Sequence, residues 1–133
     1  LGIVTTTADN GPALTRSLLT SLASERPDVI VLELGDGLLC AYGVEAILCH
    51  AALRPALTPV VLSANDPDAA WGGAKILRDQ FAIEPAVVSG PATDNAVGID
   101  QISERLGLPA INALSNGVAL GDHVFGVLHG ERK

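Results

Sequence analysis

Short aliphatic runs recur along the chain, separated by polar stretches rich in glycine and proline. Each run is continuous rather than alternating, which is typical of strands buried on both faces of a sheet. The runs start about 24 to 30 residues apart, the length of a strand–helix–strand repeat. They span residues 2–6, 29–34, 59–63, 85–89 and 109–113, with a sixth and weaker run at 124–128.

Helical periodicity fills the intervals between these runs. Apolar residues three or four positions apart share one face of a helix. Four sets have this spacing: Leu14, Leu18 and Leu22; Val44, Ile47, Leu48 and Ala51; Ala70, Ala74 and Leu77; and Val97, Ile102 and Leu106. Strands that alternate with helices predict an α/β fold, with a three-layer, mostly parallel, Rossmann-like sheet of five or six strands and helices on both faces.

The predicted helices have recognisable starts. Asn10-Gly11-Pro12 and Asn65-Asp66-Pro67 each provide a capping side chain followed by proline in the first turn. Thr93-Asp94 provides a third cap, and Gly107 can end the fourth helix in a left-handed conformation. Asn10, Asp66 and Thr93 therefore have a structural role available as caps.

The composition supports a single α/β domain over residues 1–133. The chain is 48% hydrophobic, and only four residues are aromatic, one Trp, one Tyr and two Phe. Aliphatic residues of this kind suit parallel strands covered by helices. The chain begins Leu1-Gly2-Ile3 and contains no methionine. We therefore expect either a trimmed protein or a fragment of a longer one.

The charge and the hydropathy exclude two classes of partner. The formal net charge is −7, whereas binding to a nucleic-acid backbone depends on clustered Lys and Arg. No segment approaches the roughly 18 apolar residues of a membrane span. The two cysteines, Cys40 and Cys49, form no C-x-x-C pair and no disulfide framework. These features predict a cytoplasmic protein that binds neither nucleic acid nor membrane.

Polar residues gather after the predicted strands, whereas the opposite turns contain mainly proline. In an open α/β sheet, ligands bind beyond the carboxyl ends of the strands. We therefore expect a small-molecule ligand at the loops that follow the strands. The predicted ligand-binding residues are Thr6, Glu33, Asp36, Asn65, Ser89, Thr93 and Asn95.

Glu33 and Asp36 are the predicted metal ligands. Glu33 lies near the end of an aliphatic run, where a carboxylate is costly without a partner. Asp36 follows after Leu34 and Gly35, so two carboxylates crowd one loop without a neighbouring cation. A metal ion such as Mg²⁺ or a donor-rich ligand would relieve that crowding. The alternative is that Glu33 accepts backbone N–H groups from a neighbouring loop.

Several well-known motifs are missing from the sequence. It has no G-x-x-x-x-G-K-[ST] phosphate loop, no G-x-G-x-x-G fingerprint and no G-x-S-x-G elbow. His50, His123 and His129 do not have the spacing of a zinc site. Since the predicted strand-end loops also lack Lys and Arg, a bound phosphate would depend on backbone N–H groups and helix N-termini.

Residues 26–39, RPDVIVLELGDGLL, end an apolar strand in a glutamate and a glycine-rich turn. This stretch resembles the acidic, Walker B-like strand of the dethiobiotin-synthetase-like P-loop proteins, and the runs at 59–63 and 85–89 follow in that family's order. The resemblance covers most of the chain as the C-terminal part of such a fold, without its phosphate loop. It implies that Glu33, assisted by Asp36, helps to hold magnesium and a nucleotide.

Three functions stay open on the sequence. The first is the acidic-loop part of a nucleotide-dependent enzyme that acts on a small molecule. The second is a domain of an NAD(P)-linked oxidoreductase, in which Glu33 would contact a ribose. The third is a non-catalytic ligand-binding or assembly module. For each of these three functions, the expected partner is either a second copy of the chain, in a homo-oligomer, or an additional N-terminal domain.

Overall fold

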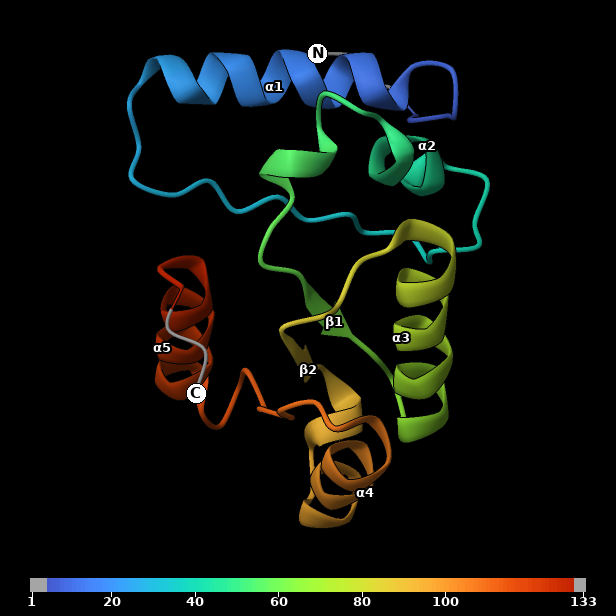
Figure 1. Cartoon of the computed structure of the whole chain (residues 1–133), viewed down its shortest axis with the longest axis vertical. Coiled ribbons are helices and arrows are strands. Elements are labelled where there is room, and N and C mark those ends of the chain that lie inside the picture. The colour runs from blue at the N-terminus through green and yellow to red at the C-terminus, as the bar shows by residue number, and fades with distance from the viewer. Residues whose placement is uncertain (1–4, 131–133) are drawn as a thin grey trace. The chain divides into compact units, whose positions relative to one another are not determined.

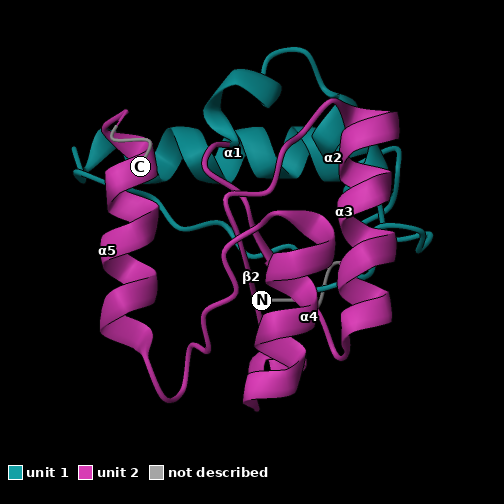
Figure 2. Ribbon diagram, turned by 60° about the horizontal axis from the view of Figure 1, so that its bottom comes forward, with its two compact units in different colours: residues 1–57 teal, residues 58–133 magenta. Residues whose placement is uncertain are grey.

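The computed structural model describes residues 5–130, which form two compact units. Figure 1 shows the chain, and Figure 2 separates the units. Unit 1 comprises residues 1–57 and unit 2 comprises residues 58–133. Within the described residues, no helix is long and apolar enough to cross a membrane.

The described residues of unit 1, 5–57, contain two helices and a single short turn of 3-10 helix. Helix α1 spans Gly11–Ser24, α2 spans Val44–Cys49, and the turn η1 spans Arg54–Ala56. The segment between α1 and α2 has no regular secondary structure. Gly43 precedes α2 with a φ of +89°, and a Cβ there would lie 2.4 Å from the carbonyl oxygen of Thr7. This close approach requires glycine and fixes the chain before α1 against the start of α2.

Unit 2 is built around two short parallel strands. Strand β1 spans Val61–Ser63 and β2 spans Val87–Ser89, with Leu62 opposite Val88. Helix α3, Pro67–Phe81, connects them. The turn η2, Pro91–Thr93, leads into α4, Ala96–Leu106, and α5 spans Gly117–Leu128. A single parallel bridge joins Val88 to Ala110. The unit is thus a strand–helix–strand motif extended by two helices.

The core of unit 2 depends on small side chains. Gly73 faces Leu62, whose Cδ1 would lie 3.1 Å from an added Cβ. Small residues at such positions let a helix pack closely against a strand. One buried cluster joins the two strands to α3 and α4, and it contains Ala64, Ala70, Ala74, Val88, Ala92, Ile102 and Leu108.

The predicted sheet of five or six strands is wrong. Among the described residues, only the runs at 59–63 and 85–89 contain strands, and the run at 109–113 contributes the single bridge at Ala110. The run at 29–34 is irregular and 124–128 lies within α5. Residues 5 and 6 of the first run are irregular, and residues 2–4 lie outside the described residues. A Rossmann-like three-layer architecture is therefore not formed. A short aliphatic run does not specify a strand by itself, because strands need neighbours that satisfy their backbone.

The four predicted helices are present, and two of the three predicted side-chain caps are wrong. Asp66 caps α3, with its Oδ1 accepting from the Ala69 N–H at 2.7 Å. Gly107 ends α4 with a φ of +64°, as predicted. The cap of α4 is Asn95 rather than Thr93 or Asp94, because the Asn95 side chain is the one that accepts from the Gly98 N–H. Asn10 precedes α1 without capping it, and instead its Oδ1 accepts from the Thr7 N–H.

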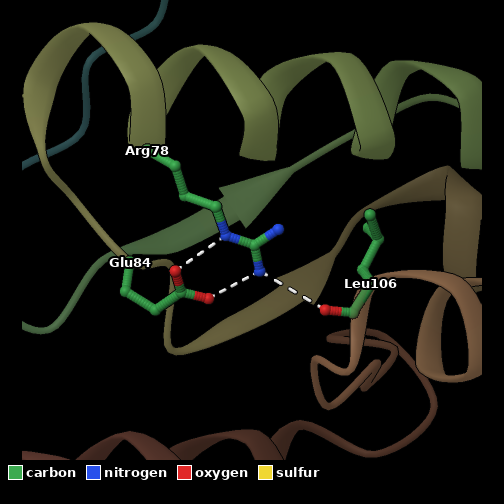
Figure 3. Close-up of polar contacts among 3 residues, drawn as sticks. All are labelled: Arg78, Glu84 and Leu106. Carbon is green, nitrogen blue, oxygen red and sulfur yellow. Dashed lines mark hydrogen bonds and ion pairs between the residues drawn. The ribbon is translucent and has the colours of Figure 1, made fainter.

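A charged pair fastens the end of α3. Arg78 donates from Nε to Glu84 Oε2 at 2.7 Å and from Nη2 to Glu84 Oε1 at 2.6 Å (Figure 3). The same Nη2 also donates to the Leu106 carbonyl at 3.3 Å, at the end of α4. These hydrogen bonds lower the pKa of Glu84 and raise the pKa of Arg78. The pair thus connects the end of α3, the chain before β2 and the end of α4.

Candidate functional site

The loops that follow β1 and β2 are joined to one another. The Ala64 N–H donates to the Ser89 carbonyl at 3.0 Å, and the Ala92 N–H donates to the Ala64 carbonyl at 2.9 Å. Gly90 lies between them with a φ of +85°, and a Cβ there would lie 2.7 Å from Ser63 Oγ. We call residues 63–66 and 89–95 the loop edge. Because its two halves share backbone hydrogen bonds, the loop edge is one structural feature.

Two helices begin at the loop edge, and their caps use some of its polar groups. Asp66 caps α3, and Asn95 Oδ1 accepts from the Gly98 N–H at 3.0 Å at the start of α4. Gly98 packs directly against the loop, since an added Cβ would lie 2.2 Å from the Ala92 carbonyl oxygen. The caps orient the first turns of both helices toward the same loops. Asp66 and Asn95 are therefore positioning groups in the chain as it stands.

Asn112 connects the loop edge to the segment before α5. It is 8% exposed, and its Nδ2 donates to Asp94 Oδ1 at 2.8 Å and to Thr93 Oγ1 at 3.4 Å. Its Oδ1 accepts from the backbone N–H of Leu114 and of Ser115, at 3.0 and 2.8 Å. The sequence-based prediction omitted Asn112. The signal for it was an amide inside the otherwise apolar run 109–113, since a buried amide needs several partners.

Ser89 contributes a buried hydroxyl that has no partner. The residue is 4% exposed, and its Oγ makes no hydrogen bond within the part of the chain that the structure describes. Thr93 beside it is satisfied, because its Oγ1 donates to the Gly90 carbonyl at 2.7 Å. An unpaired buried hydroxyl is uncommon in folded proteins, so this one needs an explanation.

The seven predicted ligand-binding residues divide between the two units. Asn65, Ser89, Thr93 and Asn95 belong to the loop edge of unit 2. Thr6, Glu33 and Asp36 belong to unit 1.

Glu33 and Asp36 are exposed on an irregular segment. The premise that Glu33 ends a buried strand is wrong, so no desolvation cost demands a partner there. Neither side chain makes a hydrogen bond or an ion pair within residues 5–130. Those residues also contain no group of three or more His, Cys, Asp or Glu side chains arranged to hold a metal.

Unit 1 has a concavity of its own beside α1. Its volume is about 830 Å³, and Arg16, Ser17, Thr20 and His50 are among the residues that line it. His50 follows α2 and is half-buried, and its Nδ1 has no hydrogen-bond partner among the described residues.

No family model, curated protein or solved structure matched this chain in comparisons with known proteins. Function is therefore inferred from the chain's own residues.

Proposed function

We propose that unit 2 binds a small polar molecule at the loop edge, so that the chain serves as a ligand-binding module. The observation that carries the proposal is the loop edge itself, which joins two strand-end loops and includes the unpaired buried hydroxyl of Ser89. Ligands of strand–helix–strand proteins bind beyond the carboxyl ends of the strands. Because the Ser89 hydroxyl is buried, the ligand has to part the two loops to reach it, and a polar atom of that ligand would then give the hydroxyl the partner that it lacks.

The side chains of the loop edge favour a neutral ligand with several hydroxyl or amide groups. The loop edge contains hydroxyls, amides and the carboxylates of Asp66 and Asp94, but no Lys or Arg. Carboxylates accept hydrogen bonds and repel anions. No nucleophile is paired with a base there, which supports binding rather than catalysis.

A second candidate is a magnesium-bound nucleotide, as part of a nucleotide-dependent enzyme. The exposed, unpaired carboxylates of Glu33 and Asp36 favour it, whereas residues 26–39, whose sequence resembles a Walker B-like strand, form no strand. The NAD(P)-linked oxidoreductase has less support, because its only argument was a Glu33 that ends a strand. A cytoplasmic location and a homo-oligomeric state remain expectations from the sequence.

The loop-edge proposal can be tested by NMR on the ¹⁵N-labelled chain. Spectra would be recorded with a panel of monosaccharides and polyols, with amino acids, with ATP and Mg²⁺, and with NAD⁺. We expect a saturable change in the amide signals of residues 63–66 and 89–95 with at least one neutral polyhydroxyl compound. Ser89→Ala should weaken that binding. Ser103→Ala, which changes an exposed serine of α4, should leave it unchanged.

Two outcomes would contradict the proposal. One is a panel in which no compound shifts the loop-edge signals. The other is binding of equal strength to the wild-type chain and to the Ser89→Ala variant. Shifts at residues 33–36 with ATP and Mg²⁺ alone would favour the second candidate instead.

A further inference from the structure

Unit 2 has a groove between α3 and α4 that the loop edge does not use. Its volume is about 550 Å³, within the range of small-molecule sites. Asp68 and Trp71 line it from α3, and Gln101, Ile102 and Arg105 line it from α4. Both helices pack on the buried cluster of unit 2. The walls of the groove are therefore held by the core, which favours a preformed site.

Trp71 is the aromatic surface of this groove. It is the single tryptophan of the chain, and 55% of it is exposed although its neighbour Ala70 is fully buried. An exposed indole in a concave surface offers a flat apolar face for stacking. Tryptophan and arginine are also the residue types that most often dominate binding energy. A planar aromatic ring is the ligand group that fits this wall.

Arg105 is the cation of the groove. It lies in the last turn of α4, and its side chain makes no hydrogen bond or ion pair with any described residue. Arg78, by contrast, is fully engaged with Glu84 and Leu106. A free guanidinium can hold a phosphate or a carboxylate through two parallel hydrogen bonds. Gln101, one turn earlier on α4, adds a donor and an acceptor on the same wall.

Asp68 sets the polarity of the opposite wall. Its carboxylate accepts hydrogen bonds and disfavours an anion beside it, so the anionic end of a ligand belongs at Arg105. An N–H donor on the ring would suit Asp68. The net charge of −7 repels anions in general. An anion without a ring would be held by Arg105 alone against this repulsion, so it should bind weakly.

We propose that this groove binds an aminopurine monophosphate or a ligand of the same design, with its ring on Trp71, its anionic group at Arg105 and its N–H donor at Asp68. The proposal does not depend on a ligand at the loop edge. Magnesium is not required, since the arginine takes the anionic group directly.

Trp71 provides the measurement, because the tryptophan emission of the chain comes from this residue alone. The full chain would be titrated with AMP, adenosine, purine riboside monophosphate and inorganic phosphate without Mg²⁺. We expect AMP to change the emission saturably. Adenosine lacks the anion, phosphate lacks the ring, and purine riboside monophosphate lacks any N–H donor on its ring. Adenosine and phosphate should bind roughly tenfold more weakly or worse, and purine riboside monophosphate should bind more weakly than AMP.

Variants of Arg105 and Trp71 test whether AMP binds in the groove. Arg105→Gln should weaken AMP by roughly tenfold while leaving adenosine unchanged. Arg26→Gln, at an exposed arginine that lines neither concavity, should change neither, and Ser89→Ala at the loop edge should leave AMP binding intact. Trp71→Leu, followed by equilibrium dialysis, should abolish binding without unfolding the chain. The proposal is wrong if AMP causes no saturable change, if adenosine or purine riboside monophosphate binds as tightly as AMP, or if Arg105→Gln binds AMP like the wild type.

Discussion

Asn112 donates from Nδ2 to Asp94 Oδ1 at 2.8 Å, and this bond ties the segment before α5 to the loop edge. Replacing Asn112 with Ala removes that bond and leaves the N–H groups of Leu114 and Ser115 without their acceptor. We expect the free energy of unfolding to fall by about 2 kcal/mol. Urea denaturation of the wild type and Asn112→Ala would measure it.

Asn116→Ala is the matched control for that variant. Asn116 precedes α5 and is exposed, and its side chain does not cap the helix. Its replacement should change stability by less than about 0.5 kcal/mol. Equal losses in the two variants would show that the Asn112 network does not hold the segment.

Gly98 and Gly72 should respond in opposite directions to a change to alanine. A Cβ at Gly98 would lie 2.2 Å from the Ala92 carbonyl oxygen, whereas a Cβ at Gly72 would meet open space beyond the backbone of its own helix. Gly98→Ala should therefore destabilise the chain by about 2 kcal/mol through overpacking. Gly72→Ala should stabilise it by about 0.5–1 kcal/mol, because alanine is the better helix former. Thermal denaturation of both variants tests the pair, and a stabilising Gly98→Ala would refute the close approach.

The Arg78–Glu84 pair should make stability depend on pH. Its hydrogen bonds lower the pKa of Glu84 in the folded chain below the ordinary value of 4.5. As the pH falls, Glu84 is therefore protonated in the unfolded chain before it is protonated in the folded chain. The stabilisation of the folded chain by the pair is full above about pH 5 and is lost as the pH drops through the folded pKa of Glu84. Since the Glu84 side chain is 61% exposed, solvent screening should keep the contribution below about 1 kcal/mol.

Urea denaturation of the wild type and Glu84→Gln between about pH 3 and pH 7 would measure this contribution. The two stabilities should converge at the acidic end. Glu104→Gln, at an exposed residue of α4, should follow the wild type throughout. A gap between the wild type and Glu84→Gln that does not narrow with acid would contradict the ion pair.

Glu33→Gln tests the magnesium–nucleotide candidate. Glu33 is exposed and lacks partners among the described residues, so its replacement should change stability by less than about 0.5 kcal/mol. If the carboxylate helps to hold Mg²⁺, the wild type should melt at a higher temperature with ATP and Mg²⁺, and the variant should lose most of that shift. Two results together would instead make Glu33 a structural residue. The melting temperature of the wild type would not change with ATP and Mg²⁺, and the variant would melt at a lower temperature than the wild type.

The helices were predictable because their signals are local. Leu14, Leu18 and Leu22 share a helix face, and Asp66 and Gly107 mark helix ends through hydrogen bonds and a left-handed φ that involve only neighbouring residues. The sheet was not predictable in the same way. Val31 belongs to an aliphatic run but is 90% exposed, and no strand forms there. The residues of a strand are stabilised by a neighbouring strand, which the run itself does not supply.

The sequence by itself determined the acidic surface, the four predicted helices, the two strands of unit 2 and the polar character of the loops after them. Tertiary structure decided which of those loops meet. The backbone of Ala64 joins the two halves of the loop edge, residues 63–66 and 89–95. Asn112, which lies 48 residues after Ala64 in the sequence, donates a hydrogen bond to the same loop edge. Glu33, by contrast, is exposed on an irregular segment. The physical reason is the range of the interactions. Caps and helix periodicity act over one or two turns, whereas strand pairing and the satisfaction of a buried amide depend on distant residues that only the folded chain brings together.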